Sequence, residues 1–104
     1  MTKETEKAFK ILYCEYKSRR KAGESKTQAI YFEDAAIRNI PGFQKWIPED
    51  IDFAVHELMV NQFVSCDICG GVTLLESGLT FMEDKPKEFW KDLSGLFDLI
   101  TLFG

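Results

Sequence analysis

The chain of 104 residues predicts an α+β fold in a single domain, and three observations carry this prediction. Apolar residues recur at helical spacing in residues 2–21 and again in residues 51–60. Two short apolar segments, residues 63–68 and 72–75, flank Gly70 and Gly71 as the strands of a β-hairpin would. Residues 86–104 carry a further apolar stripe. We therefore expect three helices, a hairpin and an additional C-terminal helix.

The first half of the chain is expected to be mainly helical. The first helix should cover residues 2–21, with Phe9, Leu12, Tyr13 and Tyr16 on one buried face. Gly23 is expected to stop it, within the linker-like residues 21–26. Residues 27–31 are predicted to form a short strand. Residues 32–40 should then form a short helix that ends before Pro41.

The second half is expected to begin with a third helix at Pro48, since proline suits a first helical turn. Asn61 can adopt the left-handed conformation that closes such a helix. Gly70 and Gly71 should supply the positive φ angles of a tight hairpin. A short helix is predicted to start near Ser77 and to reach Met82.

This order of elements resembles the winged helix-turn-helix fold, with three helices and a β-hairpin wing in residues 1–84 and an apolar helix in residues 85–104. Residues 58–64, residues 72–82 and the charged residues 83–85 are also similar to the small YjcQ-type winged-helix proteins of Gram-positive bacteria and their phages. The resemblance implies a cytoplasmic protein with a role in transcription or phage regulation. It implies no catalytic activity and no cofactor.

DNA binding is the first functional expectation, and its candidate residues are basic. Between residues 17 and 26 five cations stand against Glu24 alone, and two more follow near the second helix. The candidate phosphate contacts are Lys17, Arg19, Arg20, Lys21, Lys26, Arg38 and Lys45. The ordinary alternative is a solvated helix end, where cations also favour the negative pole of the helix dipole.

The third helix departs from the pattern of a DNA reader. Such a helix reads the major groove through donors that match base edges and phosphates. No Lys or Arg lies between Pro48 and Met82, and the face opposite the core carries Glu49, Asp52, Phe53, His56, Glu57 and Val60. The alternative function is therefore a protein-interaction module that uses Asp52, Phe53, His56, Glu57 and Val60 and does not bind DNA.

The apolar C-terminal stripe predicts either packing on the first helix or a homodimer. Its residues are Phe89, Trp90, Leu93, Leu96, Phe97, Ile100 and Phe103. Wide exposed apolar stripes are rare on monomers, which favours the dimer. Binding to a membrane surface is the third alternative, but the polar face lacks the usual excess of cations.

Cys66 and Cys69 form a Cys-x-x-Cys pair that resembles half of a zinc knuckle. Structural zinc takes four ligands, and only the isolated Cys14 and His56 remain as further candidates, so we expect no bound metal. A redox pair is less expected in a hairpin than at a helix start. His56 lies one turn after Asp52 and has no nucleophile in a recognisable motif, so no catalytic residue is assigned and a non-enzyme is predicted.

The composition limits the partners and the compartment. The net charge of −4 argues against strong non-specific attraction to nucleic acid, although a local basic patch would still permit it. Residues 1–10 are charged, so no signal peptide is expected. No run reaches the roughly 18 apolar residues of a spanning helix. Three cysteines and no export signal fit a reducing cytoplasm.

Overall fold

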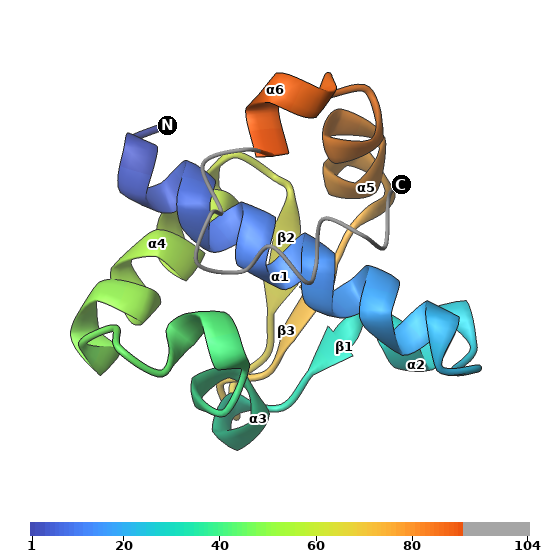
Figure 1. The fold of residues 1–104 in the computed structure, drawn as a ribbon. Helices are drawn as coiled ribbons and strands as arrows, with labels where there is room; N and C mark the ends of the chain where they lie inside the picture. Colours follow the sequence, from blue (N-terminus) through green and yellow to red (C-terminus); the bar gives the residue numbers. More distant parts are fainter. Residues whose placement is uncertain (91–104) are drawn as a thin grey trace.

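The computed structural model describes residues 1–90 of the chain, which form an α+β fold around a small antiparallel sheet (Figure 1). The α-helices within this range are α1 (Lys3–Lys21), α2 (Lys26–Ala29), α3 (Asp34–Arg38), α4 (Pro48–Val60), α5 (Glu76–Glu83) and α6 (Lys87–Trp90). A 3-10 turn, η1 (Pro41–Phe43), joins α3 to α4. The strands are β1 (Tyr31–Phe32), β2 (Val64–Cys66) and β3 (Val72–Leu74).

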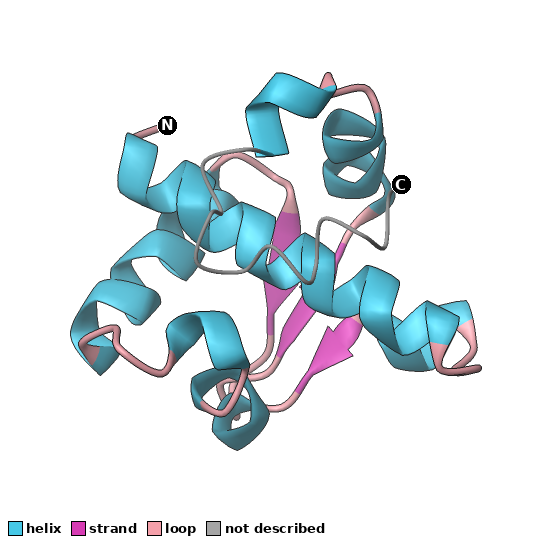
Figure 2. Cartoon of the chain, in the orientation of Figure 1, coloured by secondary structure: helices cyan, strands magenta, loops and turns pink. Residues whose placement is uncertain are grey.

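The sheet joins two distant parts of the chain. Its order is β1-β3-β2, with both neighbouring pairs antiparallel, so β3 is central and β1 is an edge strand. Tyr31 lies opposite Thr73, and Cys66 lies opposite Val72. Figure 2 shows the three strands side by side, with α1 running across them. This layout is compatible with the winged-helix arrangement that the sequence resembles.

The core lies between α1, α4 and the sheet. Phe9 is fully buried on α1 and stacks on Phe63, with 5.3 Å between the ring centroids. Leu58 of α4 and Leu74 of β3 belong to the same buried cluster. The apolar spacing that predicted one buried face on the first helix is confirmed, because Phe9, Leu12, Tyr13 and Tyr16 are all buried.

Helix α1 has clear signals at both ends. The Thr2 hydroxyl oxygen accepts a hydrogen bond from the Thr5 N–H at 3.1 Å, which satisfies one of the free donors of the first turn. At the other end Gly23 has a φ of 101° and its N–H donates to the Arg20 carbonyl. The predicted first helix and its stop are thus confirmed, with Thr2 as the cap.

The strand predicted at residues 27–31 is wrong for most of its length. Residues 26–29 form α2, and the strand begins only at Tyr31. The cause is a capping box: the Ser25 hydroxyl accepts from the Gln28 N–H at 3.2 Å, and the Gln28 side chain accepts from the Ser25 N–H at 3.3 Å. These two bonds stabilise a helical turn. The short helix predicted at residues 32–40 is present as α3, over a shorter range.

The end of α4 and the hairpin turn also differ from their predictions in detail. Helix α4 begins at Pro48 as expected, but Gln62, with a φ of 64°, takes the left-handed conformation assigned to Asn61. In the hairpin only Gly70 has a positive φ, 86°, and the loop is five residues long, from 67 to 71. The turn is therefore wider than a Gly-Gly hairpin. Helix α5 confirms the helix predicted near Ser77.

Candidate functional site

The exposed side of α4 presents an apolar and acidic stripe. Glu49, Phe53, His56 and Val60 are spaced by four, three and four residues, so they follow one side of the helix. All four are exposed, and Phe53 and Val60 keep 64% and 66% of their surface accessible. The opposite side of α4 is buried through Ile51, Ala54, Val55 and Leu58. The amphipathic division predicted for this helix is therefore confirmed.

The charge on α4 is entirely negative apart from any charge on His56. Its four carboxylates are Glu49, Asp50, Asp52 and Glu57, and the helix contains no Lys or Arg. Asp52 lies 3.9 Å from the Arg38 guanidinium. Glu57 is half-buried and accepts a hydrogen bond from the Thr2 N–H at 2.9 Å, which lowers the pKa of the Glu57 carboxyl. A phosphate backbone brought to this face would meet carboxylates, which repel it.

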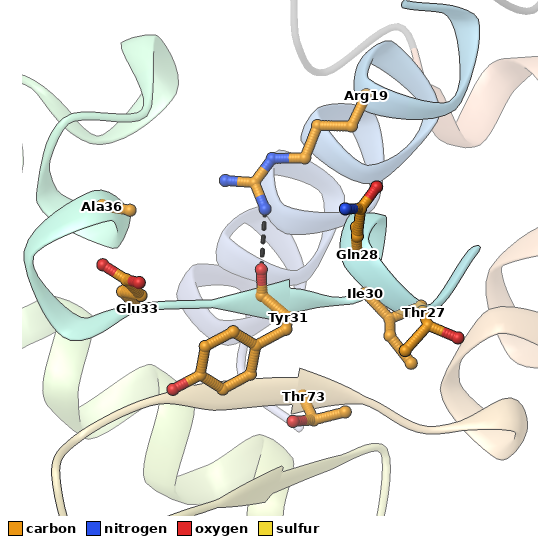
Figure 3. Close-up of a pocket in the computed structure, with 8 residues that line it drawn as sticks. All are labelled: Arg19, Thr27, Gln28, Ile30, Tyr31, Glu33, Ala36 and Thr73. Carbon is orange, nitrogen blue, oxygen red and sulfur yellow. Dashed lines mark hydrogen bonds between the residues drawn. The ribbon is translucent and has the colours of Figure 1, made fainter. Parts of the chain in front are cut away.

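Arg19, a predicted DNA contact, is used within the fold. Its guanidinium donates to the Tyr31 carbonyl at 2.7 Å, as Figure 3 shows, and pairs with Glu15 at 3.0 Å. It also lies over the Phe32 ring, 4.4 Å from the centroid. These contacts join the end of α1 to the edge strand β1. The signal that sequence reasoning missed is the Glu15–Arg19 spacing of four residues, which pairs charges on a helix.

The other basic candidates do not form one patch. Lys26 pairs with Glu76 of α5, and Arg38 pairs with Asp52 of α4. Lys45 lines a hollow of about 430 Å³ together with Lys3 and Lys7, near the start of α1. The start and end of this helix of 19 residues lie about 27 Å apart at 1.5 Å per residue.

A small basic hollow does remain at the end of α1. Lys17, Arg20 and Lys21 line it with Gly23 and Glu24, and its volume is about 430 Å³. Within residues 1–90 no ion pair joins these three cations to a carboxylate, although Arg20 donates to the Glu24 carbonyl at 3.1 Å. Three of the seven predicted DNA contacts are therefore together and available to an anion.

The hollow drawn in Figure 3 is larger, about 650 Å³, and lies beside β1. Its lining includes Arg19, Gln28, Tyr31 and Glu33. The Arg19 guanidinium is already bonded to Tyr31, and the lining holds no His or Cys. We see no set of side chains there suited to nucleophilic or acid–base catalysis.

The four candidate metal ligands lie in three separate places. Cys14 is buried in the core, and burial raises the pKa of its thiol to about 12. His56 is on the exposed stripe of α4, whereas Cys66 and Cys69 are exposed at the hairpin. Among residues 1–90 no group of three or more His, Cys, Asp or Glu side chains is placed to hold a metal ion.

Phe89 and Trp90 pack on α1 of the same chain. The Trp90 ring stacks on Tyr13 with 5.5 Å between centroids, and the Lys10 ammonium lies 4.0 Å from the centroid of the Phe89 ring. Trp90 is only 7% exposed, so it has little surface left for a second copy. The other dimer candidates, Leu93, Leu96, Phe97, Ile100 and Phe103, lie outside the described residues.

In the described part of the chain no helix combines the length and the apolar character needed to cross a membrane. Comparisons with known protein families, curated proteins and solved structures found no match to this chain.

Proposed function

We propose that residues 1–84 are a winged-helix domain. The order of helix, edge strand, helix, turn, helix and hairpin supports this, and so does the sheet order β1-β3-β2. In this reading α1, α3 and α4 are the three helices and β2–β3 is the wing. Helix α4 then occupies the place of the helix that reads DNA in winged-helix regulators.

We propose further that the domain is a protein-interaction module whose exposed α4 stripe binds its partner. The observation that carries this proposal is the exposure of Phe53 and Val60, two large apolar side chains on one line of the helix. The core does not need them, and water solvates them poorly. Aromatic side chains of this kind are frequent centres of protein interfaces.

The partner is expected to be a basic segment with apolar side chains. Glu49 and Asp52 lie beside the exposed apolar side chains of α4, so cations on the partner would meet carboxylates next to its apolar contacts. A helix or an extended segment rich in Lys, Arg and Leu fits this chemistry. The net charge of −4 on the whole chain also favours such a partner.

The test compares two surface variants in a partner screen followed by a binding titration. Phe53→Ser with Val60→Ser removes the stripe, and Ile68→Ser is the matched control because Ile68 is fully exposed on the hairpin. A partner that binds the wild type and the control should bind the double variant at least about 30-fold more weakly. The affinity of the wild type for this partner should also decrease as the salt concentration rises. Equal binding by all three proteins would refute the assignment to α4.

DNA binding is the second candidate, and the hollow lined by Lys17, Arg20 and Lys21 favours it. In this reading the chain is a small transcription regulator that contacts phosphates with the end of α1. Arg20→Ala with Lys21→Ala should weaken binding for every DNA sequence and reduce the salt slope by roughly one unit per lost contact. Arg19 is left intact because it holds β1. Absence of binding to mixed DNA at low salt would remove this candidate.

The homodimer through the C-terminal stripe stays a proposal. Leu96→Asp with Phe97→Asp would place two charges in its centre, where burial without partners is costly. The mass in sedimentation should then halve. A wild-type chain that is monomeric at high concentration would show the idea to be wrong.

A further inference from the structure

The hairpin tip carries two exposed thiols on a short loop. Cys66 is the last residue of β2, and Cys69 follows three residues later in the loop. Both are exposed free cysteines. Ile68, between them, is fully exposed at 104% of its reference surface. The tip therefore combines an exposed apolar side chain with two thiols.

The loop is held by Asp67 without any metal. One Asp67 carboxylate oxygen accepts hydrogen bonds from the N–H groups of Cys69 and Gly71, at 2.9 and 2.8 Å. The other oxygen accepts from the Tyr31 hydroxyl at 3.1 Å. These bonds lower the pKa of Asp67, chiefly through the Gly71 N–H. The two cysteines are therefore presented on a preformed turn.

Two thiolates make half of a tetrahedral sulfur site. Zinc in structural sites takes four ligands, with zinc–sulfur distances of about 2.3 Å. In the described part of the chain no third side chain is placed to complete the set, because Cys14 is buried in the core and the Asp67 oxygens are already bonded. A second pair of thiolates, from another molecule, would complete a four-sulfur site. The exposure of the tip lets an identical tip approach it.

We propose that Cys66 and Cys69 of two copies bind one zinc ion, which joins the two hairpin tips through four sulfur ligands. The isolated chain then binds no metal by itself, and the ion is held only by a pair of chains; this departs from the expectation from the sequence that no metal is bound. Ile68 of each copy is buried in the contact. Thiolate ligands select zinc over magnesium or calcium, which prefer oxygen.

Carboxylates also lie at the tip: Asp67 is in the loop, and a Cβ placed on Gly70 would be 3.0 Å from the Asp34 carboxyl carbon. Two such tips repel each other. Four thiolates and one divalent ion add two further negative charges, so the zinc–sulfur bonds must offset the whole of this repulsion.

The experiment adds zinc chloride to the reduced full-length protein and measures mass by sedimentation, with a phosphine reductant present to prevent disulfides. The mass should at least double relative to the metal-free protein, because a dimer joined through the C-terminal stripe would carry two tips, and elemental analysis should give one zinc for two chains. Cys66→Ser and Cys69→Ser should each abolish both effects. His56→Asn is the matched control and should behave as the wild type.

Thermal unfolding separates this bridge from a structural zinc site. Because Asp67 holds the loop, the two serine variants and the chelator-treated wild type should unfold at the same temperature as one another. One zinc per chain with unchanged mass would overturn the proposal. So would an unchanged mass at a tenfold excess of zinc, or doubling that survives Cys66→Ser.

Discussion

Helices α1 and α4 pack against each other, yet they divide their residues between core and surface very differently. Nine of the 19 residues of α1 are buried, including Lys10 and Thr5. Only four of the 13 residues of α4 are buried, while Phe53, Met59 and Val60 are exposed. The apolar residues of α1 are therefore mostly buried in the core, whereas several apolar residues of α4 are exposed and do not contribute to the core.

This difference separates residues whose contacts stabilise the fold from exposed residues that make no such contact. Even a cation of α1, Arg19, is bonded to the edge strand. The exposed residues of α4 have no comparable role within residues 1–90, apart from Asp52 beside Arg38 and Glu57 beside Thr2. Substitutions should then act on stability in α1 and on binding in α4.

The largest effect is expected from Phe9→Ala. Phe9 is fully buried and stacks on both Phe63 and Phe81, so the cavity should lower the free energy of unfolding by about 3–5 kcal/mol. Phe53→Ala removes the same side chain from an exposed position and should change it by less than about 0.5 kcal/mol. Urea unfolding of the two variants gives the comparison directly. Similar losses would show that Phe53 belongs to the fold.

Arg19→Ala should come next, at about 2 kcal/mol, because it removes charge-assisted bonds to Tyr31 and Glu15 at a mostly buried side chain. Arg20→Ala, one residue later on the exposed side, should cost much less. Thermal unfolding of both variants measures the difference. If Arg20→Ala destabilised the protein as much as Arg19→Ala, the structural role of Arg19 would be refuted.

The starts of the two helices should respond in opposite directions. Thr2→Ala removes the capping hydroxyl of α1 and should cost about 1 kcal/mol. Helix α4 has Ile47 at this position, without a side-chain cap, so Ile47→Ser should stabilise the protein by roughly 0.5 kcal/mol. The melting temperature of Thr2→Ala should therefore lie below that of the wild type, and the melting temperature of Ile47→Ser should lie above it. A loss in both would mean that Ile47 packs favourably where it is.

The smallest effect concerns pH and the bond between the two helices. The Thr2 N–H lowers the pKa of Glu57 below its ordinary value of 4.5 in the folded protein. The folded state therefore gains stability from this carboxylate above that pH and loses it as the pH falls through the lowered pKa. The melting temperatures of the wild type and Glu57→Gln should converge between about pH 5 and pH 3. A constant difference would exclude this linkage.

The regular elements were predictable where a local pattern was strong. Helices α1 and α4 were predictable because each carries an apolar stripe along one side. Two boundaries also have local signals: Gly23 follows the end of α1, and Pro48 begins α4. Helix α2 was not recognised because its capping box holds only four helical residues, too few to show a period. The left-handed residue after α4 was misplaced by one position, since Asn61 and Gln62 are adjacent polar residues.

The residue types of the candidate sites could be predicted from the sequence, but which of these residues lie together in space could be predicted less well. The exposed face of α4 follows from helical spacing alone. The basic cluster does not hold together, because Lys26 pairs with Glu76, fifty residues later in the chain, and Arg38 pairs with Asp52. Contacts between distant segments leave no local pattern. The bond from Tyr31 to Asp67, which fixes the hairpin loop, is of the same kind.

The buried amine of Lys10 allows the docking of α6 on α1 to be measured by chemical labelling. Its ammonium is 1% exposed and lies over the ring of Phe89. An amine-acylating reagent can reach it only when this region opens, whereas Lys21 on the same helix is exposed throughout. The ratio of labelling rates at these two lysines would measure the opening equilibrium without an added probe. A ligand or partner that stabilises the docked state would be detected as slower acylation of Lys10.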